Sequence, residues 1–486
     1  MSNNFEIKPS GIYNPSNYCY LNSLLQCLRH ISPIIKFFNK NINFDNTLYS
    51  IINFFNLNIY DEEEINTKIE SLEKVINELY TNNEVTNISN TFLKNITVDI
   101  KPLLNNSRLI NDFKNNNNSL DNEEFIDDEV ENNILNREYK KILQNKNFIN
   151  NITKIKVVYI ITSENISKDR FLWFLKKIKK NRMAILLYDN LKSFIMDLSD
   201  FNKTLVPNSM IQTIDSFVQN SDFAHLSDGN QQDIHELLQL IIYGLHESHS
   251  DTIEINIPQD TINMSDEDID KLEINERIKK KLNKTIYNTY KDNFTTIIMD
   301  MHFYNLKLIQ CRSCNHKSIN FDDASCILTE IPNNNDNSVT LTIYDCLESH
   351  FSIEPLDGFK CDNCGSQNSV MLNKLLTKPE TLVIGFKRFV YNPILGGSSK
   401  IYNNITYPSI LNVSKYCPIS SNEGNMYKLK CVLNHIGNVH GGHYYTYCYS
   451  NNLNNWYNLN DINVNKIDIN QVLHNQNAYM LFYEKM

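Results

Sequence analysis

The sequence predicts an α+β protein, because its first part is helical in pattern and its last part is strand-like. From 300 to the end, short apolar runs separated by turn residues dominate, among them TLVIGFKRFVY and HYYTYCYS. Over 11–38 the apolar side chains instead recur at i, i+3, i+4 and i+7, which is one face of a helix. The residues that make this face are Leu21, Leu24, Leu25 and Leu28.

Between these parts, 40–205 is asparagine-rich and is predicted to be an insertion. We expect its low-complexity stretch near 111–124 to be a mobile surface loop. Further on, the apolar run KIKVVYIIT, the amphipathic segment SKDRFLWFLKKIKK and the run RMAILLYDN follow one another over 154–196. Strand, helix and strand in this order predict a small βαβ-like unit.

Composition narrows the class of protein. The chain has 486 residues and a net charge of −10, which argues against a nucleic-acid backbone as the main partner. No apolar run reaches the length of a membrane helix, and the start MSNNFEIKPS lacks a signal-peptide pattern. We therefore expect an intracellular protein, cytoplasmic or nuclear, without membrane insertion. Its eleven cysteines should be reduced thiols, metal ligands or catalysts. The oligomeric state is not indicated.

The first candidate for chemistry is Cys19, which directly precedes the helical run. A thiol at the start of a helix sits at the positive end of the helix dipole, which favours the thiolate. The alternative is that Cys19 is a small core residue, the interpretation that we also give to Cys27. Only a histidine that activates Cys19, oriented by a third group, would make it a nucleophile.

The stretch LNHIGNVHGGHYYTY at 433–447 offers such a histidine. His443 follows two glycines, which let the backbone pass close to a bound chain, and it begins an aromatic, strand-like run. Asn460 and Asp461 lie 17 and 18 residues later at a turn, so a hairpin would bring one of them beside His443. For His435 and His440 we expect ordinary core or surface positions.

Two Cys-x-x-Cys pairs supply four thiolates, the ligand set of a closed tetrahedral structural zinc site. The pairs are CRSC and CDNC, and they contain Cys311, Cys314, Cys361 and Cys364. Their wide separation places the two halves at the ends of separate hairpins. The alternatives are redox pairs or core thiols. Because four protein ligands leave no open position, one such zinc ion would be structural.

A further helix is predicted in DGNQQDIHELLQLIIYGLHE at 228–247, with Asp233 and Glu236 in its first turn. These carboxylates either complement the helix dipole or bind a basic peptide.

In this order, the motifs resemble those of the ubiquitin-specific proteases, a family of papain-like cysteine peptidases. GIYNPSNYCYLNSLLQ is similar to the family's nucleophile motif, and HIGNVHGGHY to its histidine motif. WYNLNDINV resembles the final motif, QQDIHELL the Gln-Gln-Asp helix, and TLVIGFKRF a family strand. The resemblance covers about 11–38, 206–247 and 300–486.

The resemblance implies a catalytic domain over 8–486, with a helical thumb, a β-rich palm and zinc-bearing fingers at 300–375; the insertion then falls within the thumb. It implies a thiol protease that hydrolyses the isopeptide bond after the C-terminal Gly-Gly of ubiquitin, with ubiquitin or ubiquitinated proteins as partners and no catalytic cofactor. Carried over position by position, Cys19 is the nucleophile, and His443 acts first as the base and then as the acid. Asn460 orients His443, with Asp461 as the second candidate for that role. Asn14 would donate a hydrogen bond to the oxyanion. The implied substrate-binding residues are Gln232, Asp233, Glu236, Gly441, Gly442 and Tyr444.

Two positions depart from the family motif. Ser16 stands where the family has glycine, and Tyr18 where it has threonine. If the glycine position needs a positive φ, serine is strained there by about 1 kcal/mol or more. These two positions keep open the alternative of a ubiquitin-binding pseudoenzyme. The motifs also leave open a protease for a ubiquitin-like modifier.

Overall fold

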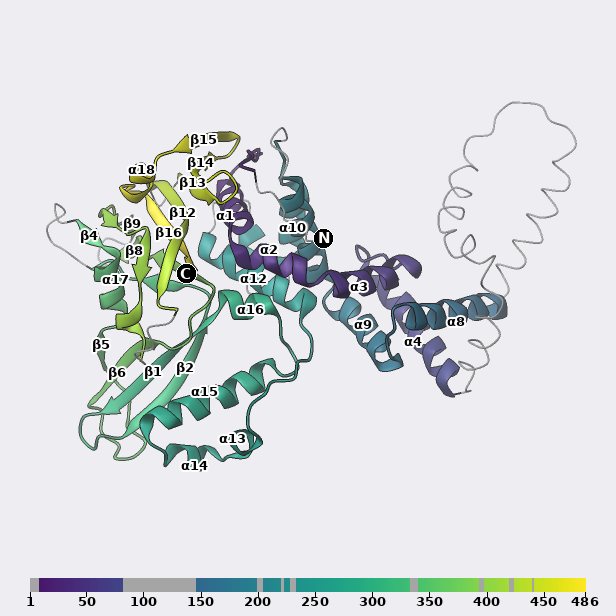
Figure 1. Cartoon of the computed structure of the whole chain (residues 1–486), viewed down its shortest axis with the longest axis horizontal. Helices are drawn as coiled ribbons and strands as arrows, with labels where there is room; N and C mark the ends of the chain where they lie inside the picture. Colours follow the sequence, from purple (N-terminus) through teal and green to yellow (C-terminus); the bar gives the residue numbers. More distant parts are fainter. Residues whose placement is uncertain are drawn as a thin grey trace, which may run out of the picture. The chain divides into compact units, whose positions relative to one another are not determined.

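The computed structural model describes residues 8–81, 146–198, 204–219, 223–227, 233–332, 340–392, 397–418, 424–438 and 441–486 (Figure 1). The low-complexity stretch 111–124, His440 and Gln232 lie outside these ranges. The chain divides into two compact units, one made of residues 1–40 and 183–486, the other of residues 41–182. Both helices and sheets are present, so the predicted α+β class is confirmed.

The first unit contains most of the described helices. They are α1 (Cys19–His30), α2 (Ser32–Lys40), α10 (Arg182–Asp197, from Met183 onward), α11 (Asn208–Val218), η2 (Ala224–Ser227), α12 (Ile234–His249), α13 (Gln259–Asn263), α14 (Asp266–Asp270), α15 (Ile274–Tyr290), α16 (Thr296–Met301), α17 (Ile343–His350), η3 (Ser414–Tyr416) and α18 (Ile469–Leu473).

The main sheet has eight described strands in the order β15-β14-β13-β12-β16-β7-β3, with β11 paired to β12. Their bounds are β3 (Ile327–Thr329), β7 (Thr381–Phe386), β11 (Ile410–Asn412), β12 (Met426–Asn438), β13 (Gly441–Ser450), β14 (Asn455–Asn460), β15 (Asn463–Ile467) and β16 (Ala478–Lys485). Pairing is antiparallel except between β3 and β7. The long β12–β13 hairpin is the part of this sheet that bears on the site.

A second sheet, of order β2-β1-β6-β5, forms a separate projection at the lower left of Figure 1. Its strands are β1 (Phe303–Cys311), β2 (Lys317–Ala324), β5 (Ile353–Leu356) and β6 (Ser369–Leu375). Two short pairs complete the strands: β4 (Leu341–Thr342) with β10 (Ile405–Thr406), and β8 (Phe389–Asn392) with β9 (Gly397–Lys400). The second sheet falls within the range predicted for the fingers.

Helix α1 is buried around its whole circumference, because it packs against the β12–β13 hairpin on one side and α12 on another. Leu24, Leu25 and Leu28 have no exposed surface, and burial of each such side chain contributes roughly 1.5–3 kcal/mol. Polar side chains on the other face are buried as well and must find hydrogen-bond partners there. The predicted helix over this region is thus confirmed, and it begins at Cys19.

The predicted βαβ-like unit at 154–196 is wrong. This segment forms three helices, α8 (Lys146–Ser163), α9 (Lys168–Lys180) and α10. The middle helix agrees with the prediction, but short apolar runs cannot distinguish a strand from a buried helix. Over the whole of α10 the fully or nearly fully buried residues Ile185, Tyr188, Leu191 and Ile195 recur every three or four positions, which is helical spacing.

The second unit is therefore all-helical where it is described. It consists of α3 (Ile42–Phe54), α4 (Glu62–Thr81), α8 and α9. Acidic α4 and basic α9 lie together, and Lys179 Nζ is 3.1 Å from Glu70 Oε1. No described helix is both long and apolar enough to cross a membrane.

Candidate active site

Cys19 is the first residue of α1, and its side chain is 4% exposed. The loop before it is shaped by Asn14, whose Oδ1 accepts hydrogen bonds from the backbone N–H groups of Ser16 and Tyr18, both at 3.2 Å. Among the described residues, the non-glycine positions with positive φ are all asparagine or aspartate. Ser16 therefore does not have a positive φ, and the backbone strain considered for a serine at the family's glycine position is absent.

His443 lies on β13, the returning strand of the β12–β13 hairpin, and Asn460 ends β14, which pairs with β13. The predicted hairpin brings the two side chains together, with His443 Nε2 2.6 Å from Asn460 Oδ1. An amide oxygen only accepts, so Nε2 carries the proton and Nδ1 is the nitrogen available to Cys19. A hydrogen bond to Cys19, with a smaller contribution from Asn460, raises the pKa of His443 to about 9.

Asp461 joins three segments at this point. Its Oδ2 accepts from Asn14 Nδ2 at 3.2 Å and its Oδ1 from Asn22 Nδ2 at 2.8 Å. Its carboxylate is also 4.0 Å from His443 Nε2, and its carbonyl accepts from the N–H of Ile12 at 2.9 Å. Asp461 adopts φ 49°, which aspartate tolerates better than most residues. The structure thus brings Asn14, Cys19, His443, Asn460 and Asp461 together in one site.

Sequence analysis did not single out Asn22, which is buried three residues after Cys19. Helical spacing could have indicated this residue, because Cys19 and Asn22 are at positions i and i+3 and therefore share a face of the helix. Gly11 was also not singled out. A Cβ at Gly11 would lie 2.7 Å from the carbonyl oxygen of Ile462, so glycine permits the close approach of the N-terminal segment to the β14–β15 turn.

The implied substrate-binding residues Gly441, Gly442 and Tyr444 have different surroundings. A Cβ at Gly441 would meet no described atom within 4 Å, whereas one at Gly442 would lie 2.2 Å from His435 Nε2. Gly442 is thus required by packing inside the protein, and Gly441 borders open space. Tyr444 is 3% exposed, and its ring centroid is 4.6 Å from that of His435.

His435 is buried, as expected for an ordinary core residue, and it is held by Lys400 at the end of β9. Lys400 Nζ lies 2.9 Å from His435 Nδ1 and donates to the carbonyls of His435 and Gly437 at 2.9 and 3.2 Å. Burial and the charge of Lys400 lower the pKa of His435 to about 4, so the ring is neutral. Lys400 thereby holds the end of β12, the strand paired with the one that carries His443.

The predicted carboxylates lie at the start of α12. Asp233 is its N-cap and accepts a hydrogen bond from the N–H of His235 at 2.8 Å, so it stabilises the start of the helix; binding of a basic peptide by this carboxylate stays a prediction. The Oε2 of Glu236, in the first turn, lies 2.5 Å from the Nε2 of His225. Burial, with a smaller contribution from the charge of Asp233, raises the pKa of Tyr444.

The four predicted zinc ligands come together at the tip of the second sheet. Their sulfur atoms all lie within 4.8 Å of one another, and two of the sulfur pairs, Cys311–Cys364 and Cys314–Cys361, are 3.7 Å apart. With Zn–S bonds of 2.3 Å, the edge of a tetrahedral site is about 3.8 Å.

The two turns also have the same shape. Asn315 N–H donates to the Cys311 carbonyl at 2.9 Å, and Gly365 N–H to the Cys361 carbonyl at 2.8 Å; both donors have positive φ. The cluster is therefore compatible with a structural zinc ion.

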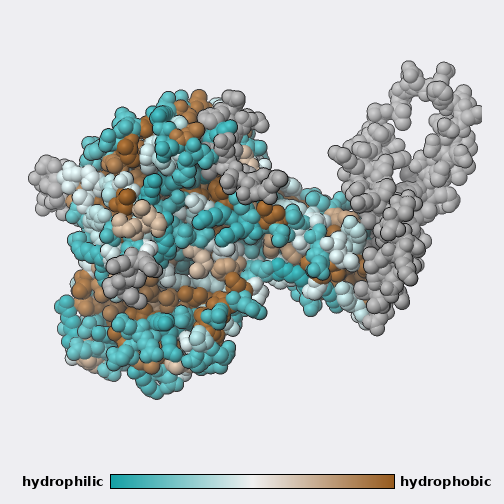
Figure 2. Space-filling view, in the orientation of Figure 1, coloured by the Kyte–Doolittle hydropathy of each residue, from teal (hydrophilic) through white to brown (hydrophobic). Residues whose placement is uncertain are grey.

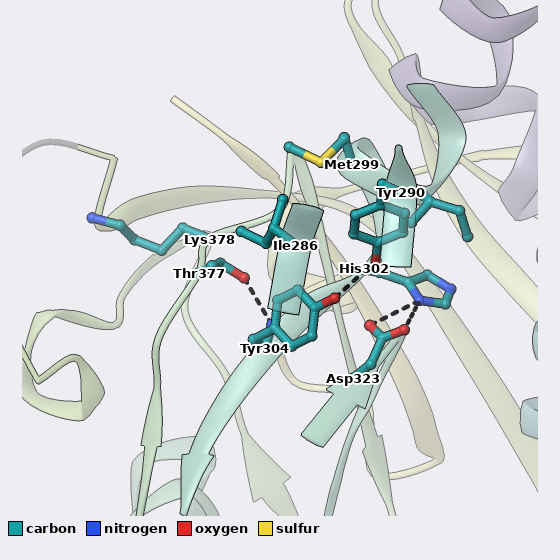
Figure 3. Close-up of a pocket in the computed structure, with 9 residues that line it drawn as sticks. Ile286, Tyr290, Met299, His302, Tyr304, Asp323, Thr377 and Lys378 are labelled. Carbon is teal, nitrogen blue, oxygen red and sulfur yellow. Dashed lines mark hydrogen bonds and ion pairs between the residues drawn. The ribbon is translucent and has the colours of Figure 1, made fainter. Parts of the chain in front are cut away.

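A cavity of about 80 Å³ lies elsewhere, where α15 and α16 meet β1 and β2 (Figure 3). Its polar groups satisfy each other: His302 Nδ1 is 3.1 Å from Asp323 Oδ1, and the Tyr304 hydroxyl donates to that of Tyr290 at 3.3 Å. None of the predicted site residues lines this cavity. We interpret it as a packing junction of the helices with the second sheet.

A cysteine at a helix start, a histidine and an asparagine in hydrogen-bonded sequence form the arrangement that thiol peptidases use. The model of the ubiquitin carboxyl-terminal hydrolase family matches residues 10–169 and 135–483, and the chain belongs to this family.

Among its relatives is a probable ubiquitin carboxyl-terminal hydrolase of Acanthamoeba polyphaga mimivirus, 37% identical over 179 residues, which are 35% of this chain and 37% of the relative. Ubiquitin carboxyl-terminal hydrolase 2 of Homo sapiens is 27% identical over 288 residues, 58% of this chain and 45% of the relative. The matches thus span less than half of these relatives' own length.

The fold is similar to that of solved SAGA DUB modules of Ubp8, Sgf11, Sus1 and Sgf73. One is described as bound to monoubiquitin and has a TM-score of 0.52 at 18% identity. Another is described as bound to ubiquitin aldehyde and has a TM-score of 0.52 at 17% identity. Each comparison covers all of this chain and 71% of the other, and at this identity it shows the fold.

Proposed function

We propose that this protein is an active deubiquitinating cysteine peptidase, which hydrolyses the isopeptide or peptide bond after the C-terminal Gly-Gly of ubiquitin. The observation that carries the proposal is the chain of contacts from Cys19 through His443 to Asn460, with Nε2 and Oδ1 2.6 Å apart. The family and the solved neighbours described as bound to ubiquitin support ubiquitin as the substrate.

In the first step, the thiolate of Cys19 attacks the carbonyl carbon of the terminal glycine, and His443 donates its proton to the leaving amine. This yields a thioester and a free amine. In the second step, His443 takes a proton from a water molecule, which attacks the thioester. Ubiquitin leaves with a free carboxylate, and Cys19 is regenerated.

We assign Asn14 as a hydrogen-bond donor to the oxyanion that forms during the reaction. One N–H of its amide donates to Asp461, and the other is available to a developing negative charge. Such a donor stabilises the transition state by about 3 kcal/mol. Asp461 holds this amide and the start of α1 relative to His443, so we place it as a positioning residue.

For substrate binding we propose the carboxylates of Asp233 and Glu236 against the basic tail of ubiquitin. Gln232, outside the described residues, is included on the family motif alone. Gly441 and Gly442 would border the slot for Gly-Gly, with Tyr444 packed behind them. Figure 2 shows apolar surface over the base of the second sheet, and Ile353 on β5 is 62% exposed, as expected of a surface that receives a folded protein.

Cys311, Cys314, Cys361 and Cys364 are proposed to hold one zinc ion that stabilises the tip of the fingers. No step of the reaction passes through it, because four thiolates leave no open position.

The proposal is tested with ubiquitin that carries a C-terminal electrophile, followed by mass-spectrometric identification of the labelled residue. We expect labelling of Cys19, and its loss in Cys19→Ala while ubiquitin binding survives. Binding of ubiquitin without labelling of the wild type would indicate a pseudoenzyme. Labelling only by probes made from a ubiquitin-like modifier would indicate the other alternative.

A further inference from the structure

A second cluster of cysteines, separate from the fingers, lies under the candidate active site. Cys27 comes from α1, Cys431 from β12 and Cys448 from β13, and none of the three has exposed surface. Their sulfur atoms all lie within 4.8 Å of one another, and Cys431 and Cys448 are directly opposite in the β12–β13 register. Three segments far apart in sequence therefore bring their thiols to one point in the core.

His30 adds a nitrogen to this cluster. It lies three residues after Cys27 on α1 and is 4% exposed. Its Nδ1 is 2.7 Å from the carbonyl oxygen of Gln26 and must donate to it, so in the neutral ring Nε2 bears the lone pair. In the described part of the chain Nε2 lacks a well-aligned hydrogen bond, and Cys448 interacts with the imidazole both electrostatically and as a side-chain hydrogen-bond partner. Metal-binding histidines are commonly held in this way, by Nδ1–H on a backbone carbonyl.

We propose that Cys27, Cys431 and Cys448, with His30 as the fourth ligand, bind a second structural zinc ion. Three thiolates and one imidazole are a complete tetrahedral ligand set. Sulfur separations within 4.8 Å require shifts of about 1 Å or less to reach the tetrahedral edge of about 3.8 Å. The set would carry one net negative charge with Zn²⁺, and the fully buried guanidinium of Arg29 interacts electrostatically with Cys448 from the same helix.

The competing interpretation is that these are three protonated core thiols. Cys27 Sγ does lie 3.1 Å from Thr446 Oγ1, and Cys448 and Cys431 reach backbone carbonyls at 3.6 and 3.9 Å. Thiols are weak donors, however, and in this arrangement the Cys448 thiol is the partner within the cluster that the buried imidazole of His30 has. A zinc ion would bond to the three sulfur atoms, which already lie close together, and His30 would complete the set once its Nε2 moves toward them.

Such an ion would connect the helix that begins at Cys19 to the strand that carries His443. Cys27 lies eight residues after Cys19, and Cys448 lies five residues after His443. The ion would be structural, since the four protein ligands leave no open position. Its presence does not depend on the proposed function, but its effect on catalysis, by fixing the nucleophile relative to the base, does.

The test is the metal content of the purified full-length chain, measured by mass spectrometry, together with single substitutions. We expect two zinc ions per chain in the wild type, and one in Cys431→Ser and in Cys361→Ser. The matched control is Cys346→Ser, at a fully buried cysteine outside both clusters, which should keep both ions.

One zinc ion per wild-type chain, lost in Cys361→Ser, would overturn the proposal. So would two ions that both persist in folded Cys431→Ser. Should Cys431→Ser not fold, Cys361→Ser decides the matter, because its remaining ion should resist a chelator until the chain is unfolded. These measurements need no activity and are therefore independent of the proposed function.

Discussion

Asn22 donates a hydrogen bond to the carboxylate of Asp461 at 2.8 Å, although the two residues are 439 positions apart. The bond ties the helix that begins at Cys19 to the turn that follows Asn460. Because Asn22 also lies within 3.4 Å of the Tyr13 carbonyl, it connects the loop before the nucleophile to the same turn.

We therefore predict that Asn22→Ala lowers kcat more than it raises KM, since the substrate-binding residues stay in place. Loss of a buried donor to a charged group should also lower the free energy of unfolding by roughly 1–3 kcal/mol. Steady-state kinetics on a ubiquitin C-terminal fluorogenic substrate and chemical denaturation measure the two effects. Asn46→Ala, at an exposed asparagine, is the control and should change neither. An unchanged kcat in Asn22→Ala would show that the bond does not position the site.

The pKa of His443, raised to about 9, predicts an alkaline limit to activity. The proton that His443 gives to the leaving amine is lost above that pH, so kcat/KM should fall with a midpoint near pH 9. Asn460→Ala removes one of the causes that raise this pKa, and the midpoint should move to lower pH. A pH–rate profile of both proteins checks the direction; a midpoint that moves upward or stays in place contradicts it.

The same shift has a consequence for stability. The pKa of His443 in the folded protein lies above its unfolded value of about 6.5. The stabilisation of the folded state by protonated His443 is therefore complete below about pH 6.5. It is then lost as the pH rises through about 9. Chemical denaturation of the wild type between pH 6 and 10 should show this loss, which should be smaller in Cys19→Ala because the largest cause of the shift is gone.

The two glycines before His443 give a further prediction, because their surroundings differ. Gly441→Val places a side chain in open space, so the fold should survive while kcat/KM falls at least tenfold through the narrowed slot. Gly442→Ala drives a methyl group into His435 and the Ile436 carbonyl, which should cost about 1–3 kcal/mol of unfolding free energy. Thermal unfolding and kinetics of both variants separate the effects. Equal destabilisation by both would mean that Gly441 is also a packing residue.

The sequence predicted those parts of the site that depend on local pattern. Helical spacing placed Cys19 at a helix start, and the separation of His443 from Asn460 indicated a hairpin, which the structure contains. Asn22 was missed because its partner is set by tertiary packing, which no local pattern reports. The prediction of strands in 154–196 was wrong for a related reason. Val, Ile and Leu favour burial, but the surrounding helices determine whether a helix or a strand buries them.

Removal of zinc from the fingers should loosen the second sheet without unfolding the rest. Cys361→Ser breaks the four-sulfur cluster, so hydrogen exchange should rise over 303–324 and 353–375, while α1 and β13 stay protected. The electrophilic ubiquitin probe should label this variant more slowly, because the fingers are part of the proposed substrate surface. Unchanged exchange in these strands would show that the fingers do not depend on a metal.

Lys400 provides a test of the hairpin itself. Its ammonium group holds His435 Nδ1 and two carbonyls, and its charge helps to keep the pKa of His435 at about 4. In Lys400→Met that charge is gone while burial, the larger cause, remains, so the pKa of His435 rises above its wild-type value but stays below its ordinary value near 6.5. Protonation of His435 would then begin at a higher pH than in the wild type and would repel the imidazolium of His443, so the acid limb of kcat/KM should move to higher pH. The control is Lys428→Met, on β12 but away from His435, which should leave the profile unchanged. An identical acid limb in Lys400→Met and the wild type would show that Lys400 only supports the backbone.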